Sequence, residues 1–137
     1  MDETSASSSA TPLPDASVSP PGILLSRDLI FTSKVTGTAR MLGLRVLVAG
    51  DVTLASAMIA QWQPRAVFVD LAAGDVAQPA ALLAFQKLAA PGTPFVAFGA
   101  HVDTGALAAA RGVGCDPVLP RSRFSAELPE LIRRYLG

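Results

Sequence analysis

The chain has 137 residues, half of them hydrophobic, and its 11 Lys and Arg residues balance 11 Asp and Glu residues. This length fits about one domain with a compact core. Zero net charge offers no electrostatic basis for binding nucleic acid or for attraction to a membrane surface. No apolar run approaches the roughly 20 residues that cross a bilayer. The single cysteine, Cys115, excludes an internal disulfide and fits a reducing compartment, so we expect a cytoplasmic protein.

Residues 1–21 are rich in Ser, Ala and Pro and contain few large apolar side chains. Such a segment cannot bury enough surface to offset the entropy that ordering would remove. It also lacks the basic and apolar regions of a signal peptide. We therefore predict a disordered tail over residues 1–21 and a folded domain over residues 22–137. A role of the tail as a tether or docking segment is the alternative.

The first half of the predicted domain contains two strand–helix units. Apolar runs at residues 22–26 and 45–50 are typical of buried strands. Residues 51–64 predict a helix with Asp51 as its N-cap and Pro64 at its end. Residues 27–43 predict a helix that stops at Gly43, with an apolar stripe made of Leu29, Ile30, Val35, Ala39 and Leu42.

The second half predicts three more units. The strand at residues 66–70 ends in Asp70, and a loop of small residues leads to a helix that begins at Pro79 and ends before Pro91 and Gly92. Strands at residues 94–99 and 116–120 flank a short helix at residues 103–114. A last helix is predicted to begin at Ser125, with Glu127 in its first turn and two arginines in its last turn.

Five apolar strands that alternate with five helices predict an α/β protein with a parallel sheet covered on both faces. Right-handed crossovers leave few arrangements, and the common one for five units is the flavodoxin-like (βα)5 three-layer sandwich with strand order 2-1-3-4-5. In such sheets, ligands bind where the carboxyl ends of strands 1 and 3 emerge. Asp70 ends strand 3, so it is a candidate site residue; a carboxylate that only caps the strand is the alternative.

In the order and spacing of these elements, residues 22–137 resemble a response-regulator receiver domain of the CheY-like type. The stretch "RAVFVDL" resembles the third strand of that family, which places Asp70 at the phospho-accepting aspartate. "TPFVAFGAH" resembles the fourth strand, and "GCDPVLPRSRF" resembles the fifth, where a lysine follows in the family. The resemblance implies the receiver fold and a role in two-component signalling.

The sequence departs from the family at the positions that perform phosphorylation. The acidic pair that holds Mg²⁺ is replaced by Ser26 and Arg27, and only Asp28 is acidic nearby. Serine is a weak ligand for Mg²⁺, and an arginine repels a metal ion. Gly99 stands at the family's hydroxyl residue and Arg121 at its lysine. We therefore expect poor Mg²⁺ binding, no cofactor, and an ion pair between Asp70 and either Arg27 or Arg121.

These departures favour a stand-alone pseudo-receiver, which is a signalling or protein-interaction module and not an enzyme. The alternative is an atypical response regulator that a histidine kinase phosphorylates on Asp70. A third possibility is a small enzyme or nucleotide-binding protein on the same fold, because this fold hosts many functions. The "VAGD" stretch at residues 48–51 lacks the glycine pattern of a phosphate-binding loop.

Receivers commonly communicate through the face of their fourth helix, fifth strand and fifth helix, and the resemblance implies the same face here. Ala109 lies in a stretch of small residues, whereas Arg133, Arg134 and Tyr135 are residue types enriched at interface hot spots. We predict a protein partner or a weak homodimer through this face. A solvated helix end is the alternative for the arginines.

His101 and Cys115 are two further side chains that could carry chemistry. His101 and Asp103 form an "HVD" stretch, but no second His or Cys supports a metal site, so we predict a solvated loop histidine. Cys115 has no base adjacent in the sequence, and we predict a small buried thiol.

Overall fold

Five short apolar segments form one parallel sheet in the computed structural model, which describes residues 19–137. The strands are β1 (Gly22–Leu25), β2 (Val46–Ala49), β3 (Val67–Asp70), β4 (Phe95–Gly99) and β5 (Val118–Pro120). Their order across the sheet is β2-β1-β3-β4-β5, which confirms the predicted order and fold class. The predicted tail, residues 1–21, lies outside the described residues except for its last three.

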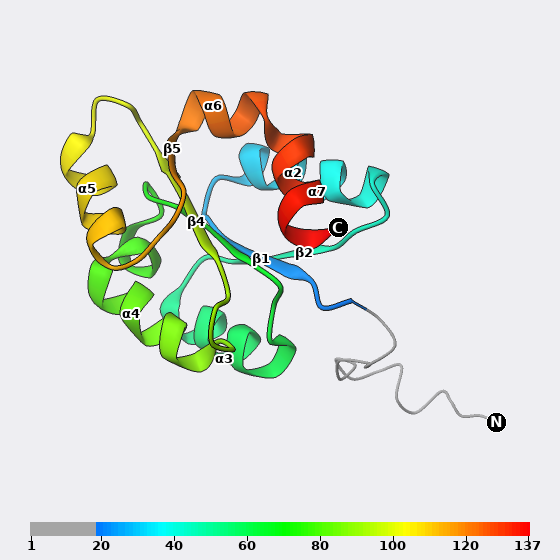
Figure 1. Cartoon of the computed structure of the whole chain (residues 1–137), viewed down its shortest axis with the longest axis horizontal. Helices are drawn as coiled ribbons and strands as arrows, with labels where there is room; N and C mark the ends of the chain where they lie inside the picture. Colours follow the sequence, from blue (N-terminus) through cyan, green and yellow to red (C-terminus); the bar gives the residue numbers. More distant parts are fainter. Residues whose placement is uncertain (1–18) are drawn as a thin grey trace.

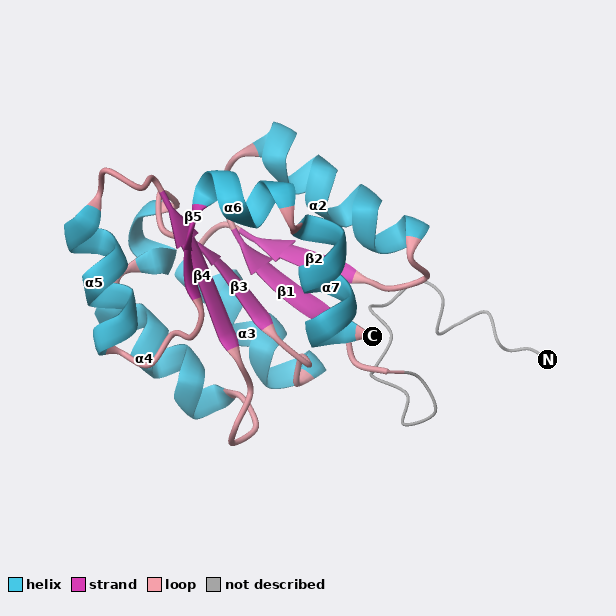
Figure 2. Ribbon diagram, turned by 45° about the horizontal axis from the view of Figure 1, so that its top comes forward, coloured by secondary structure: helices cyan, strands magenta, loops and turns pink. Residues whose placement is uncertain are grey.

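Helices cover both faces of the sheet (Figures 1 and 2). One layer consists of α3 (Val52–Trp62), α4 (Pro79–Leu88) and α5 (Thr104–Gly112). The other consists of α2 (Leu29–Met41), α6 (Arg121–Ala126) and α7 (Leu128–Leu136). A 3-10 helix, η2 (Gly74–Ala77), lies in the segment predicted to be a loop. Within residues 19–137, no helix is long and apolar enough to span a membrane.

The strands form two cores because their side chains alternate between faces. Ile23 and Leu25 of β1 pack under α3 and α4, whereas Leu24 between them packs on the opposite side. All three side chains are fully buried. This burial on both faces explains why the strands are continuous apolar runs in the sequence.

Several predicted element boundaries are confirmed. Asp51 caps α3, since its Oδ1 accepts a hydrogen bond of 2.8 Å from the amide of Leu54. Pro79 is in the first turn of α4. Gly43 follows the last turn of α2 with φ of +75°, a left-handed conformation that favours glycine.

The predicted start of the last helix at Ser125 is wrong. α6 begins at Arg121, directly after β5, and the fully buried Phe124 anchors it to the core. A separate helix, α7, begins at Leu128. Pro129 explains the interruption, because proline lacks an amide donor and is tolerated in the first turn of a helix but not in its interior.

The predicted apolar stripe of α2 is wrong at its first two positions. Leu29 and Ile30 are 81% and 86% exposed, whereas Phe31 and Thr32 face the sheet. Residues three and four positions apart lie on the same face of a helix, so Phe31 and Thr32 share the buried face of Val35. Leu29 and Ile30 lie on the opposite face and point toward solvent.

Candidate functional site

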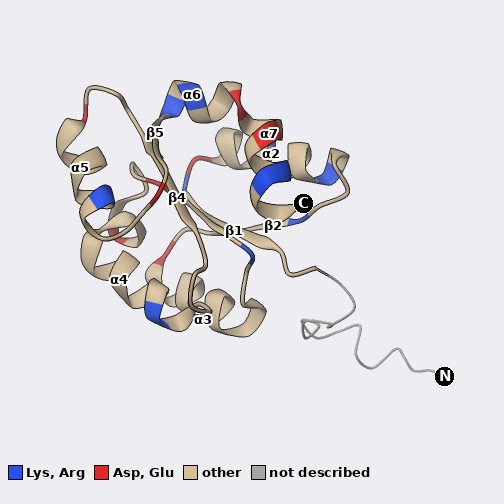
Figure 3. Ribbon diagram, viewed as in Figure 1, with Lys and Arg blue, Asp and Glu red and all other residues tan. Residues whose placement is uncertain are grey.

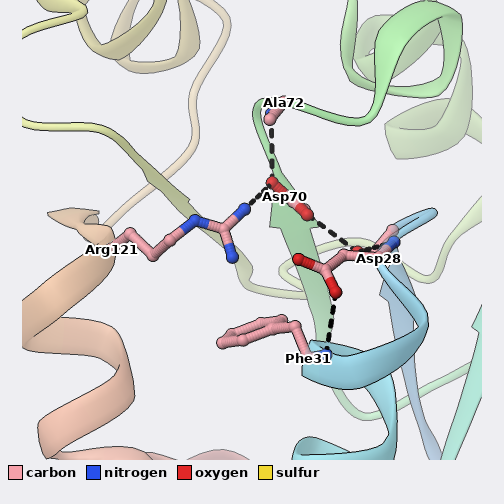
Figure 4. Close-up of polar contacts among 6 residues, drawn as sticks. Asp28, Phe31, Asp70, Ala72 and Arg121 are labelled. Atoms are coloured by element: carbon pink, nitrogen blue, oxygen red, sulfur yellow. Dashed lines mark hydrogen bonds and ion pairs between the residues drawn. The ribbon is translucent and has the colours of Figure 1, made fainter.

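Asp70 ends β3 at the carboxyl edge of the sheet, and only 2% of its surface is exposed. Three donors satisfy its carboxylate (Figure 4). Arg121 Nη2 lies 2.6 Å from Oδ1, the amide of Ala72 lies 3.0 Å from the same oxygen, and Ser26 Oγ donates to Oδ2 at 2.7 Å. A buried carboxylate needs such partners, and here both of its oxygens are hydrogen-bonded.

Arg121 is held in place by more than its ion pair with Asp70. Its guanidinium carbon lies 4.8 Å from the centre of the Phe31 ring and 5.3 Å from that of Phe98. Phe98 in turn stacks on Phe124 at 4.0 Å between ring centres. These cation–π contacts, with a side chain 31% exposed, orient the guanidinium toward Asp70. Sequence reasoning did not identify these rings; the only signal is that Phe98 directly precedes Gly99 at the end of a strand.

Ser26 links the ends of β1 and β3. It is 2% exposed, it donates to Asp70, and its Oγ accepts a bond of 3.3 Å from the amide of Asp28. Asp28 Oδ1 accepts a bond of 2.9 Å from the amide of Phe31 and thereby caps α2. The acidic residue nearest to the site is therefore bonded to the start of a helix.

Arg27, the other arginine that the sequence placed near Asp70, follows a different course. Its Cγ lies 3.3 Å from where a side chain at Gly50 would begin, and its Nη1 lies 3.0 Å from the corresponding point at Gly74. The Arg27 side chain thus extends across the loops after β2 and β3. The ion pair of Asp70 is with Arg121.

Gly99, at the family's hydroxyl position, has little room for a side chain. A Cβ there would lie 3.2 Å from Leu71 Cβ and 3.3 Å from Leu71 Cδ1. Leu71 follows Asp70 directly in the chain, and its amide donates to the carbonyl of Phe98 at 2.9 Å. An apolar side chain therefore fills the space beside Asp70 in which a hydroxyl would stand.

The side chains at this edge do not fit a magnesium ion. Mg²⁺ requires several hard oxygen ligands in near-octahedral geometry. Asp70 carries a guanidinium on one oxygen and a hydroxyl donor on the other, and Asp28 is bonded to a helix amide. In the part of the chain that the structure describes, no three His, Cys, Asp or Glu side chains gather around a common point.

The interface candidates lie on two separate elements. Ala109 is exposed on α5 and lines a hollow of about 210 Å³ between α5 and the start of α4. Arg133 and Arg134 are exposed at the end of α7, whereas Tyr135 is half-buried with its ring 6.4 Å from that of Phe68. α5 and α7 lie far apart in both views, and the helices beside β5 are α5 and α6 (Figures 1 and 2).

The two remaining candidates lie outside this arrangement. His101 is exposed in the loop after β4. Cys115 is 3% exposed, and burial raises the pKa of its thiol to about 11. The thiol is therefore protonated at neutral pH and is a poor nucleophile.

No family model and no curated protein matches this chain. Among solved structures, a CheY-like response regulator receiver domain protein from Methanospirillum hungatei JF-1 is 16% identical with a TM-score of 0.73, over 87% of this chain and 94% of that one. The receiver domain of the sensor histidine kinase PA1611 from Pseudomonas aeruginosa PAO1, with magnesium coordinated in its active-site cleft, is 19% identical with a TM-score of 0.70, over 88% and 99%.

The beryllofluoride-activated NtrC4 receiver domain dimer is also similar, with 16% identity and a TM-score of 0.64 over 84% of this chain and 98% of that one. Together with the strand order, these similarities establish that the chain has the response-regulator receiver fold.

Proposed function

We propose that this protein is a pseudo-receiver, a signalling module that acts through protein contacts and does not use Mg²⁺-dependent phosphorylation of Asp70. The observation that carries the proposal is the pairing of the Asp70 carboxylate with Arg121 at 2.6 Å and with Ser26 at 2.7 Å. In this arrangement the Arg121 guanidinium neutralises the negative charge of the Asp70 carboxylate, which a metal ion would otherwise neutralise.

The electrostatics of phosphoryl transfer support this proposal. Transfer depends on positioning and on neutralising the charge of the moving group, to which the metal ion contributes most. Here Arg121 already neutralises Asp70, and Arg27 extends across the neighbouring loops, so a divalent cation gains little attraction at this edge. Gly99 has no hydroxyl to bond a phosphoryl group, and Leu71 fills that space.

A module without phosphorylation must signal through its surface. We propose that the face formed by α5, β5 and α6 binds a protein partner or a second copy of the chain. α5 exposes small side chains at Ala108 and Ala109, which allow close approach and carry little desolvation penalty. The dimeric state of the similar NtrC4 receiver domain supports a contact between two receiver folds.

Incubation of the full chain with acetyl phosphate and Mg²⁺, followed by intact mass spectrometry, tests the proposal. We expect no phosphorylated species from the unaltered chain and none from an Asp70→Asn variant. A phosphorylated species that the Asp70→Asn variant lacks would instead support the atypical response regulator, because Asp70 stands at the end of β3 where that family is phosphorylated.

A further inference from the structure

The charges of the domain are distributed unequally between the two edges of the sheet, although the carboxyl edge also carries the bases Arg27, Arg121 and Arg123. The N-cap residues Asp28, Asp51 and Asp103 lie at the carboxyl edge, as does Asp70. The opposite edge, where the strands begin, is rich in exposed bases, with Asp116 as an exposed acid just before β5. These bases, here called the basic edge, are Arg40, Arg45, Arg65, Lys87, Arg111, Arg133 and Arg134.

This sorting follows from the topology. Each helix returns the chain from the carboxyl edge to the amino edge of a parallel sheet, so helix C-termini gather where strands begin. The helix macrodipole favours bases in last turns, and α2, α4, α5 and α7 all carry them there. Figure 3 shows Lys and Arg segments at these helix ends.

The N-terminal segment enters the domain at the basic edge. The amide of Arg65 donates to the carbonyl of Pro21 at 3.0 Å, and the amide of Gly22 donates to the carbonyl of Arg45 at 2.9 Å. A side chain at Gly22 would meet Leu136, the last residue of α7, at 2.9 Å. The chain before Gly22 therefore emerges beside Arg45 and Arg65 and next to the end of α7, which carries two more arginines.

The charge of that segment is opposite to the charge of the edge. Residues 1–18 contain the acids Asp2, Glu3 and Asp15 and no Lys or Arg. The remaining residues hold the other eight acids and all 11 bases, so the zero net charge of the chain is the sum of a negative segment and a positive domain. Asp15 is six residues from Pro21 and cannot move more than about 20 Å from it.

We propose that residues 1–18 bind the basic edge of their own domain. Because the segment is attached at Pro21, beside Arg45 and Arg65, the local concentration of its acidic side chains near the basic edge is high. A hollow of about 260 Å³ lies beside β2, next to the exit, and both Arg40 and Arg45 line it along with Leu44 and Val46.

The test uses the full chain with a spin label on a Ser8→Cys variant. Cys115 is buried with a raised pKa, so the label reacts at position 8. We expect broadening of the backbone NMR signals of Arg40, Arg45, Arg133 and Arg134 at low ionic strength. Replacement of the three acids (Asp2→Asn, Glu3→Gln, Asp15→Asn) preserves the tether but should reduce this relaxation enhancement roughly three- to tenfold, because a few exposed ion pairs are lost. Addition of 0.5 M salt should reduce it by about the same factor, because salt screens exposed charges.

A double variant Arg40→Glu, Arg45→Glu should give the same loss, whereas Arg123→Glu, which makes the same kind of charge change at the carboxyl edge, should leave the enhancement unchanged. Equal broadening in the charged and neutralised segments would overturn the proposal, because tethering alone would then explain it. Broadening spread evenly over both edges would overturn it as well.

Discussion

Arg121 at the start of α6 and Asp70 at the end of β3 form an ion pair of 2.6 Å between elements 51 residues apart in the chain. The carboxylate is 2% exposed, and the guanidinium packs against the rings of Phe31 and Phe98. This pair joins β3, the central strand of the sheet, to α6, the helix that follows the edge strand β5. We therefore expect Asp70 to have a structural role that is independent of any bound ion.

Replacing Asp70 with alanine should lower the free energy of unfolding by about 1–3 kcal/mol. The substitution leaves Arg121 and Ser26 without their acceptor, and the cost falls below that of a fully buried pair because Arg121 is partly solvated. Urea unfolding measures the change. Asp75→Ala, which removes an exposed carboxylate in η2, is the matched control and should stay within about 0.5 kcal/mol. Equal stability of the two variants would contradict a structural role for Asp70.

The strand order and the place of Asp70 could be predicted from the sequence because five apolar runs alternate with helical segments, and parallel crossovers bring all strand ends to one edge. The choice between Arg27 and Arg121 could not, since the course of the Arg27 side chain depends on Gly50 and Gly74 in other loops. The contact of Phe31 and Phe98 with Arg121 also forms only in the folded chain, where their rings lie 5.1 Å apart.

The start of α6 was missed for a local reason. The resemblance matches the stretch after Pro120 to the lysine that follows the family's fifth strand and predicts no helix there. The large apolar side chain of Phe124 is the sequence signal for a packed helix, and it is fully buried in α6. The sorting of charge between the two edges was hidden by a net charge of zero, which averages the acidic N-terminal residues with a basic domain.

A methyl group at Gly99 should destabilise the domain by about 1–3 kcal/mol, because it would press against Leu71 at 3.2 Å in a packed core. Gly105→Ala is the matched control. It lies in α5 with no atom within 4 Å of the added carbon, so it should stabilise by roughly 0.5–1 kcal/mol through helix propensity. Thermal unfolding of the two variants distinguishes the effects; a stable Gly99→Ala would mean that Leu71 moves freely and that the space beside Asp70 is open.

Cys115 should react with iodoacetamide about 100-fold more slowly at pH 8 than an exposed thiol, since burial raises its pKa from 9.0 to about 11 and lowers the thiolate fraction accordingly. The rate should rise with pH up to about 11. A Ser33→Cys variant provides a thiol at an exposed position of α2 in the same chain. Comparable rates at the two positions would show that the domain opens around β5 far more often than its packing implies.

Association through the face of α5, β5 and α6 should depend on Ala109 and not on Arg134. Ala109→Glu places a charge on α5 beside the hollow that Ala109 lines, whereas Arg134 lies on α7 in the other helix layer. Light scattering over a concentration series measures the mass, and we expect self-association that Ala109→Glu abolishes and Arg134→Glu preserves. A strictly monomeric chain at about 0.5 mM would exclude a homodimer of millimolar affinity and leave a different protein as the partner.

The most direct test of the central claim is titration of the chain with beryllofluoride in the presence of Mg²⁺, followed by NMR at the amides of Asp70, Ala72 and Arg121 and by fluorescence of Trp62. Because Arg121 and Ser26 occupy the Asp70 carboxylate, we predict no saturable change at millimolar magnesium. A Ser26→Asp, Arg27→Asp, Arg121→Lys variant, which restores the family's charges, serves as the positive comparison. Saturable binding by the unaltered chain at sub-millimolar magnesium would contradict the pseudo-receiver account.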